Sequence, residues 1–203
     1  MDRPLHAVVL PPSPRLLDAL ADALGGGPAI CPLSPGLPEP ALRGLLDALA
    51  PDAVETPDGL VRRAPGGHPP VDAGTAVLIA TSGSTGAPKF VEVSQDALRH
   101  SAAGTLARIE AKPDDRWLCC LPTSHISGVQ VLVRSLLAGT EPVITPRFDA
   151  AAVARADGFH VSLVPTQLRR LLDTGADLAR LGAIVLGGAA AAPGLLALSL
   201  IHI

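Results

Sequence analysis

Ala-Val-Leu-Ile-Ala-Thr-Ser-Gly-Ser-Thr-Gly-Ala-Pro-Lys, residues 76–89, carries the strongest structural signal in this 203-residue chain. The apolar run 76–80 predicts a strand that is buried on both faces of a parallel sheet. A polar loop follows it directly at 81–89, and residues 90–93 are predicted to be extended again. In layered α/β proteins, ligands bind beyond the carboxyl ends of such strands.

Strand-like and helix-like segments alternate along the chain. Further strands are predicted at 5–10, 117–121, 142–145, 160–164 and 183–186. Ser13 is predicted to cap a helix that begins at Pro14 and ends at the glycines 25–27, and Ser94 to cap a helix at 95–109. Further helices are predicted along the leucines at 42–49, and at 129–138, 150–156 and 167–173. Residues 31–40 and 51–74 are predicted to be loops. This alternation predicts a layered α/β fold with a largely parallel sheet.

Composition excludes some classes of function. The net charge is −3, aromatic residues make up 2%, and there is no Tyr, so a nucleic-acid partner is not expected. The three cysteines, Cys31, Cys119 and Cys120, are odd in number and lack a CxxC spacing. We therefore expect neither a disulfide framework nor a metal site built on them, and a reducing cytoplasm fits.

Residues 183–203 contain no Asp, Glu, Lys or Arg, and this length is sufficient to cross a membrane. However, Gly187-Gly188 and Pro193-Gly194 break the segment into a short strand and a helical piece. The N-terminus also lacks the apolar region of a signal peptide. We expect a cytoplasmic protein without stable membrane insertion, and a membrane-anchored protein is the alternative.

The loop at 81–89 has the chemistry of a polyphosphate site. Glycines let the backbone N–H groups approach a ligand closely, hydroxyl groups can donate hydrogen bonds, and a lysine adds a positive charge. These residues are Gly83 and Gly86, then Ser82, Ser84 and Thr85, and finally Lys89. Because Pro88 precedes the lysine, the loop is not a Walker A motif. The alternative for such a loop is a flexible surface turn.

The nine residues Thr81–Lys89 resemble the phosphate-binding signature of the adenylate-forming superfamily, which includes acyl-CoA synthetases, luciferases and the adenylation domains of peptide synthetases. The superfamily usually has Gly after the lysine, whereas this chain has Phe90. The resemblance implies that the phosphates of ATP are bound by Thr81, Ser82, Gly83, Ser84, Thr85, Gly86 and Lys89.

A second segment, Leu-Pro-Thr-Ser-His-Ile-Ser-Gly at 121–128, resembles the Leu-Pro-x-x-His-x-x-Gly segment of the same superfamily. That resemblance implies that His125 shapes the carboxylate pocket beside the adenylating centre. A lone His in a loop is otherwise usually just solvated. Residues 184–189 resemble the strand and Gly187-Gly188 turn that lie against the adenine and the acyl group.

Residues 125–143 resemble the o-succinylbenzoate–CoA ligases of menaquinone biosynthesis. In these ligases the residue matching Arg134 helps to hold the second carboxylate of the substrate, with Ser127 and Gly128 nearby. Bidentate Arg–carboxylate geometry suits this role. The alternatives are that Arg134 reaches the surface or pairs with an acid such as Glu141.

The resemblance implies an incomplete N-terminal domain of an adenylate-forming enzyme. In it, residues 1–74 form an N-terminal helical and loop region and 75–203 a truncated AMP-binding core. The implied reaction is ATP-dependent activation of a carboxylic acid and its transfer to coenzyme A, with o-succinylbenzoate as the acid. The alternatives are another acyl-CoA synthetase, a carrier-loading adenylation domain, or a non-catalytic nucleotide-binding fragment.

Three later elements of the superfamily pattern are missing from the sequence. They are a Tyr-Gly-x-Thr-Glu-like segment that packs adenine and binds Mg²⁺, an Asp that holds the ribose hydroxyls, and the C-terminal lid domain with the lysine that supports adenylation. We therefore expect the main Mg²⁺ ligand outside this chain, and the chain alone to be inactive. The last residues, about 197–203, are expected not to be native. We leave open whether the protein forms a homodimer.

Overall fold

The computed structural model describes residues 3–63, 68–82 and 88–195. The chain divides into two compact units. The first unit comprises Met1–Leu98 and Thr123–Ile126, and the second comprises Arg99–Pro122 and Ser127–Ile203. The division into functional regions at residue 74 stays a prediction.

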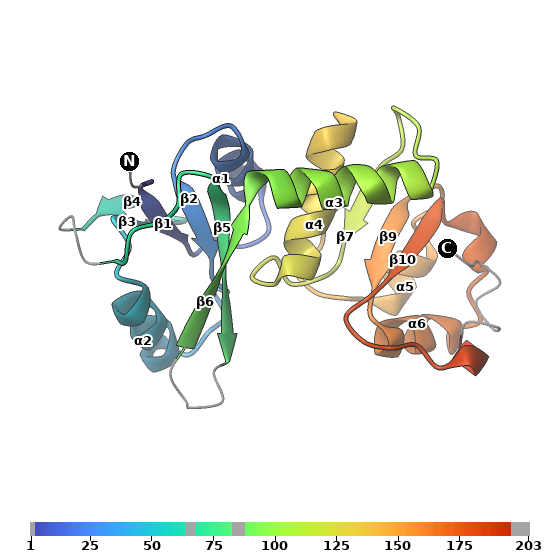
Figure 1. Ribbon diagram of the computed structural model, residues 1–203. Coiled ribbons are helices and arrows are strands. Elements are labelled where there is room, and N and C mark those ends of the chain that lie inside the picture. Colours follow the sequence, from blue (N-terminus) through green and yellow to red (C-terminus); the bar gives the residue numbers. More distant parts are fainter. Residues whose placement is uncertain (1–2, 64–67, 83–87, 196–203) are drawn as a thin grey trace. The chain divides into compact units, whose positions relative to one another are not determined.

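The first unit contains a six-stranded sheet with the order β4-β3-β1-β2-β5-β6 (Figure 1). Its strands are β1 (Leu5–Val8), β2 (Ala29–Pro32), β3 (Ala53–Thr56), β4 (Gly59–Arg62), β5 (Thr75–Ser82) and β6 (Pro88–Ser94). The four central strands are parallel, and the two outer strands, β4 and β6, pair antiparallel with their neighbours. The sheet is thus largely parallel, as predicted.

Two helices cover this sheet, α1 (Pro14–Leu24) and α2 (Glu39–Leu49). The Ser13 hydroxyl caps α1 by accepting from the Leu16 N–H at 3.4 Å, and Pro14 occupies the first turn, as the sequence predicted. Helix α2 packs on the core cluster that contains Leu5, Ala7, Ala29 and Cys31. Helix α1 packs against β2 and β5, and its buried leucines lie outside that cluster.

The second unit contains a four-stranded, entirely parallel sheet with the order β10-β9-β7-β8. Its strands are β7 (Trp117–Cys119), β8 (Val143–Ile144), β9 (His160–Leu163) and β10 (Ala183–Leu186). Its short helices are α5 (Ala150–Ala154), α6 (Pro165–Leu172) and the 3₁₀ helix η1 (Leu178–Arg180). Helices α3 (Gln95–Arg108) and α4 (Ile126–Ala138) each begin in the first unit and continue into the second.

The two faces of the second sheet differ in polarity. Leu118, Val161 and Ile184 point to one face and pack with the buried residues of α5 and α6. Side chains alternate along a strand, so their neighbours Trp117, His160 and Ser162 point to the other face. All three of these side chains are buried. The second face therefore places polar groups inside the unit.

Most of the predicted elements are confirmed, but two loop predictions are wrong. Residues 51–74 contain the β3–β4 hairpin, and the predicted loop at 31–40 begins inside β2. These strands were not predicted because prolines and charged residues are typical of loops. Here β4 is an edge strand with exposed residues, and Pro32 stands at the end of β2. Within the described part of the chain, no helix is long and apolar enough to cross a membrane.

Candidate functional site

The predicted phosphate loop joins β5 to β6 in the first unit. These strands pair in register up to the loop, with Thr81 opposite Lys89 and Ser82 opposite Pro88. The Thr81 hydroxyl donates a hydrogen bond to the Lys89 carbonyl oxygen at 3.2 Å, and Lys89 is exposed. The other predicted phosphate ligands, Gly83, Ser84, Thr85 and Gly86, lie outside the described residues. The hairpin thus brings together Thr81 and Lys89.

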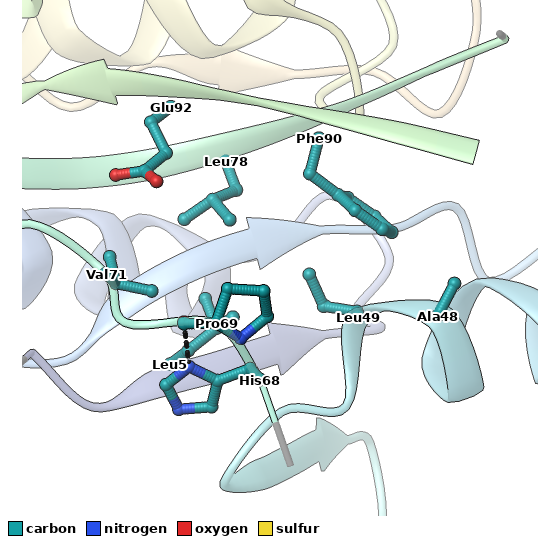
Figure 2. A pocket seen from close by; sticks show the side chains of 9 residues that line it. All are labelled: Leu5, Ala48, Leu49, His68, Pro69, Val71, Leu78, Phe90 and Glu92. Atoms are coloured by element: carbon teal, nitrogen blue, oxygen red, sulfur yellow. Dashed lines mark hydrogen bonds between the residues drawn. The ribbon is translucent and has the colours of Figure 1, made fainter. Parts of the chain in front are cut away.

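Phe90, where the superfamily usually has glycine, packs against the core cluster under α2. Its ring forms part of the wall of a cavity of about 180 Å³ in the first unit (Figure 2). The other lining residues are Leu5, Ala48, Leu49, His68, Pro69, Val71, Leu78 and Glu92. None of the predicted site residues lines this cavity. Phe90 therefore has a structural role, which anchors the strand that carries Lys89.

The second predicted motif lies at the beginning of α4. His125 directly precedes the helix and is exposed, Ser127 is half-buried, and Gly128 is buried in the first turn. The buried Cys119 thiol donates weakly to the Gly128 carbonyl oxygen at 3.8 Å. Burial raises the pKa of Cys119 to about 12, so this thiol is not a nucleophile at neutral pH.

Arg134 lies on α4 and is 7% exposed, which excludes a guanidinium that reaches the surface. Its Nη1 donates to the Ser162 hydroxyl on β9 at 3.0 Å, and its guanidinium carbon lies 5.2 Å from the ring centre of Trp117. Among the described residues it forms no ion pair, so the proposed pairing with Glu141 is also wrong. Burial lowers the pKa of Arg134 to about 10, and it stays charged at neutral pH.

The Arg134 side chain has a hydrogen-bond donor without an acceptor among the described residues. Its Nε atom is buried and has no hydrogen-bond partner within the described residues. Burying a charge without a counter-charge is costly, and such a cation is normally paired. The arrangement is therefore suited to an anion that the described residues do not supply.

Trp117 on β7 and His160 on β9 lie on the same buried face of the second sheet as Ser162, and these three residues with Arg134 are called the polar layer. The Trp117 and His160 ring centres lie 5.2 Å apart, and His160 Nε2 lies 3.0 Å from the Asp115 carboxylate. A Cβ atom on Gly182 would lie 2.8 Å from His160 Nδ1, so glycine is needed for the close packing of this ring. Sequence reasoning missed Trp117, His160 and Ser162 as neighbours of Arg134. The only signal was their alternation with the apolar core residues.

Gly187 and Gly188 follow β10 in the second unit. The Gly187 N–H donates to the Leu163 carbonyl oxygen at 3.1 Å, so β10 stays attached to β9 here. Gly188 has a φ of +81°, and a Cβ atom there would lie 3.0 Å from a methyl group of Val164. The turn therefore requires glycine at 188. Their predicted contact with a substrate stays a prediction.

No group of three or more His, Cys, Asp or Glu residues that could hold a metal ion occurs in residues 3–63, 68–82 and 88–195. An Mg²⁺ ligand elsewhere in the protein stays a prediction.

A sequence model of the family described as AMP-binding enzyme matches residues 46–199, which is more than half of the chain. The chain therefore belongs to the AMP-binding enzyme family. Within this family it is 35% identical to a 2-succinylbenzoate–CoA ligase of Escherichia coli over 190 residues, which cover 88% of this chain and 42% of that protein.

A probable 2-succinylbenzoate–CoA ligase of Mycobacterium tuberculosis is 35% identical over 130 residues, 58% of this chain and 33% of that protein. Matches to both relatives thus span less than half of their length. Among solved structures, an arginine-to-lysine variant of E. coli MenE with bound OSB-AMS superposes with a TM-score of 0.73 and 30% identity, covering 98% of this chain and 47% of that one.

The fold is also shared with o-succinylbenzoate coenzyme A synthetase (MenE) from Bacillus subtilis in complex with AMP. The TM-score is 0.76 at 23% identity, with 98% of this chain and 58% of that chain covered. The similarity supports the mixed α/β fold with mostly parallel sheets.

Proposed function

We propose that the protein to which this chain belongs activates o-succinylbenzoate with ATP and transfers the acyl group to coenzyme A. The observation that carries the proposal is Arg134, a buried cation without an acidic partner among the described residues. A dicarboxylate substrate can supply the missing counter-charge through the carboxylate that does not react. The 2-succinylbenzoate–CoA ligases among the relatives support the same substrate.

The reaction has two displacement steps. In the first, a carboxylate oxygen of the acid attacks the α-phosphorus of ATP in line, and pyrophosphate leaves. In the second, the thiolate of coenzyme A attacks the carbonyl carbon of the acyl-adenylate, and AMP leaves. No residue of this chain acts as a nucleophile.

The chain contributes positioning and charge to the first step. Lys89 and the hydroxyl groups of Ser84 and Thr85 hold the β- and γ-phosphates, so that negative charge on the leaving pyrophosphate is stabilised. Thr81, Ser82, Gly83 and Gly86 complete this phosphate loop. The antiparallel pairing of β5 and β6 favours this role, because it fixes both ends of the loop.

The acid is bound by a second group of residues. Arg134 holds the unreacted carboxylate, with Ser127 and Gly128 beside it, and His125 shapes the pocket of the reacting carboxylate. Gly187 and Gly188 form the wall next to the adenine and the acyl group. Of these residues only Arg134 is buried and charged, so Arg134 determines the preference for a dicarboxylate.

The test is turnover of the full-length protein with a series of acids in a thioesterification assay. We expect o-succinylbenzoate to be preferred, and Arg134→Ala to remove this preference while ATP–pyrophosphate exchange with simple monocarboxylates changes little. A protein whose selectivity is unchanged by Arg134→Ala is not a dicarboxylate ligase of this kind. Scrambling residues 81–89 is expected to abolish exchange with every acid, and retained exchange would contradict the phosphate-loop assignment.

A further inference from the structure

Four buried polar atoms without a hydrogen-bond partner among the described residues gather in the second unit. They are Trp117 Nε1, Gln130 Oε1, Arg134 Nε and His160 Nδ1. Two of them lie one turn apart on α4, and the other two lie on the neighbouring strands β7 and β9. Folded proteins leave few buried polar atoms unpaired. Four such atoms together, one of them on a charged side chain, indicate that these residues have a role in addition to packing.

Trp117 is the centre of the polar layer. Its indole is completely buried, and the guanidinium carbon of Arg134 lies 5.2 Å from its ring centre. An aromatic face attracts a cation at this distance, and a planar guanidinium can stack on the ring. Ser162 binds one end of the same guanidinium at 3.0 Å. The indole face and this hydroxyl thus both contact the guanidinium and contribute to its orientation.

The indole is itself held in place. The His160 ring contacts it at 5.2 Å between ring centres with an angle of 58° between planes. His160 is in turn fixed by the Asp115 carboxylate at 3.0 Å and by close packing over Gly182. A chain of contacts therefore runs from the Asp115 carboxylate to the Arg134 guanidinium.

We propose that Trp117 is a positioning residue for Arg134, and that its indole face orients the guanidinium toward the unreacted carboxylate of the substrate. This inference rests on the proposed function. The stack leaves the Nε–H of Arg134 without a partner in the described chain, so that this group can donate to the ligand. Because the ring carries no charge, it orients the cation without neutralising it, which a carboxylate in the same place would do.

The test compares two substitutions in the full-length protein. Trp117→Phe keeps an aromatic face, whereas Trp117→Leu removes it. Each variant is assayed with o-succinylbenzoate and with the analogue whose unreacted carboxylate is replaced by a carboxamide. We expect Trp117→Leu to raise KM for o-succinylbenzoate about tenfold with little change in kcat, and to leave KM for the carboxamide unchanged. Trp117→Phe should stay within about threefold of the wild type for both acids.

Equal losses with both acids in Trp117→Leu would make Trp117 a plain core residue and overturn the proposal. A Trp117→Phe variant as impaired as Trp117→Leu would also overturn it, because the aromatic face would then not be the active feature. If the Trp117→Leu variant does not fold, the His160→Gln variant tests the proposal instead. It keeps an amide for Asp115 but removes the ring against the indole, and we expect a smaller rise in KM for o-succinylbenzoate alone. An unchanged ratio of the two KM values in His160→Gln then refutes the proposal.

Arg134→Met belongs in the same series, because it separates this inference from the proposed function. If Arg134→Met leaves the ratio of the two KM values unchanged, the proposed dicarboxylate substrate fails together with the positioning role. If Arg134→Met changes the ratio and folded Trp117→Leu does not, only the positioning role of Trp117 fails.

Discussion

Arg134 combines charge with burial at a cost to the fold. Its pKa is lowered to about 10 because burial disfavours the charged form. At neutral pH the guanidinium is nevertheless protonated, so the cost of its burial opposes folding. For a cation whose pKa is lowered in the folded state, this cost persists at all lower pH values. It is relieved only as the pH rises above the folded pKa.

We therefore expect Arg134→Met to stabilise the protein while it removes the preference for dicarboxylates. The expected gain is on the order of 1–3 kcal/mol in the free energy of unfolding, because an apolar side chain of similar length replaces an unpaired buried charge. Denaturant unfolding at pH 7 measures this gain, and Arg43→Met on the exposed surface of α2 serves as the control. A destabilised Arg134→Met variant would show that Arg134 is part of the packing and not a cost to it.

Asp52, in the first unit, should make the stability of the protein depend on pH. Its carboxylate accepts from the Leu5 N–H at 2.8 Å and lies 2.9 Å from His68 Nε2. Desolvation raises the pKa of Asp52, but the hydrogen bonds from Leu5 and His68 outweigh it, and the pKa is lowered overall. A carboxylate with a lowered pKa stabilises the fold above the pKa of the unfolded chain, and this contribution is lost as the pH falls through the folded pKa.

Asp52→Asn should consequently be less stable than the wild type at pH 5–6, and the difference should close below about pH 4, the ordinary range for Asp. Melting temperatures of both proteins between pH 2 and pH 6 measure this convergence. A difference that stays constant down to pH 2 would mean that the charge of Asp52 contributes nothing. Asp58→Asn, on the β3–β4 turn, is the control for a general charge effect.

At the scale of elements, local signals were sufficient for most of the fold. Ser13 with Pro14 predicted the beginning of α1, and the Ser94 hydroxyl accepts from the Ala97 N–H at 3.1 Å at the start of α3. The β3–β4 hairpin could not be predicted from its own residues. It is held by pairing of β3 with β1, a strand about fifty residues earlier, and local propensity does not report such contacts.

Part of the candidate site could likewise be predicted from the sequence, and part of it could not. The phosphate loop and the segment around Arg134 are visible in the sequence because their residues are consecutive or lie on one helix. The stack beneath Arg134 is not, because Trp117 and Ser162 come from two strands that only the parallel pairing of β7 and β9 brings together. The unpaired Nε of Arg134 depends on the same packing.

In the turn after β10, alanine should be tolerated less well at Gly188 than at the adjacent Gly187, which serves as the control. Gly188→Ala places a Cβ atom in a left-handed conformation and 3.0 Å from Val164. We expect a loss of about 1–2 kcal/mol in the free energy of unfolding. Gly187→Ala has open space around its Cβ atom and no positive φ, so it should change stability by only a few tenths of a kcal/mol.

Thermal or denaturant unfolding of both variants measures the difference between the two glycines. Equal losses would mean that neither the close contact with Val164 nor the left-handed backbone determines the turn. A loss confined to Gly187→Ala would contradict the geometry of β10 directly.

At the scale of the whole molecule, each unit has a core of its own and carries a different part of the proposed chemistry. The hairpin of the first unit carries the phosphate loop, and the polar layer of the second carries Arg134. Matches to the 2-succinylbenzoate–CoA ligases span less than half of those proteins. The sequence contains no Tyr, so the Tyr-Gly-x-Thr-Glu-like segment that the superfamily uses for adenine and Mg²⁺ is not present in these 203 residues.

We therefore expect the 203-residue chain alone to be inactive in ATP–pyrophosphate exchange with o-succinylbenzoate, whereas the full-length protein is active. The reason is that the predicted phosphate loop supplies only part of the stabilisation of the transition state, and the predicted Mg²⁺ ligand and lid domain supply the rest. Adding the remaining part of the protein in trans tests whether the missing groups, and not misfolding of the chain, limit the reaction. Recovery of exchange on this addition supports the expectation, and exchange by the chain alone at a rate near that of the full-length protein would refute it.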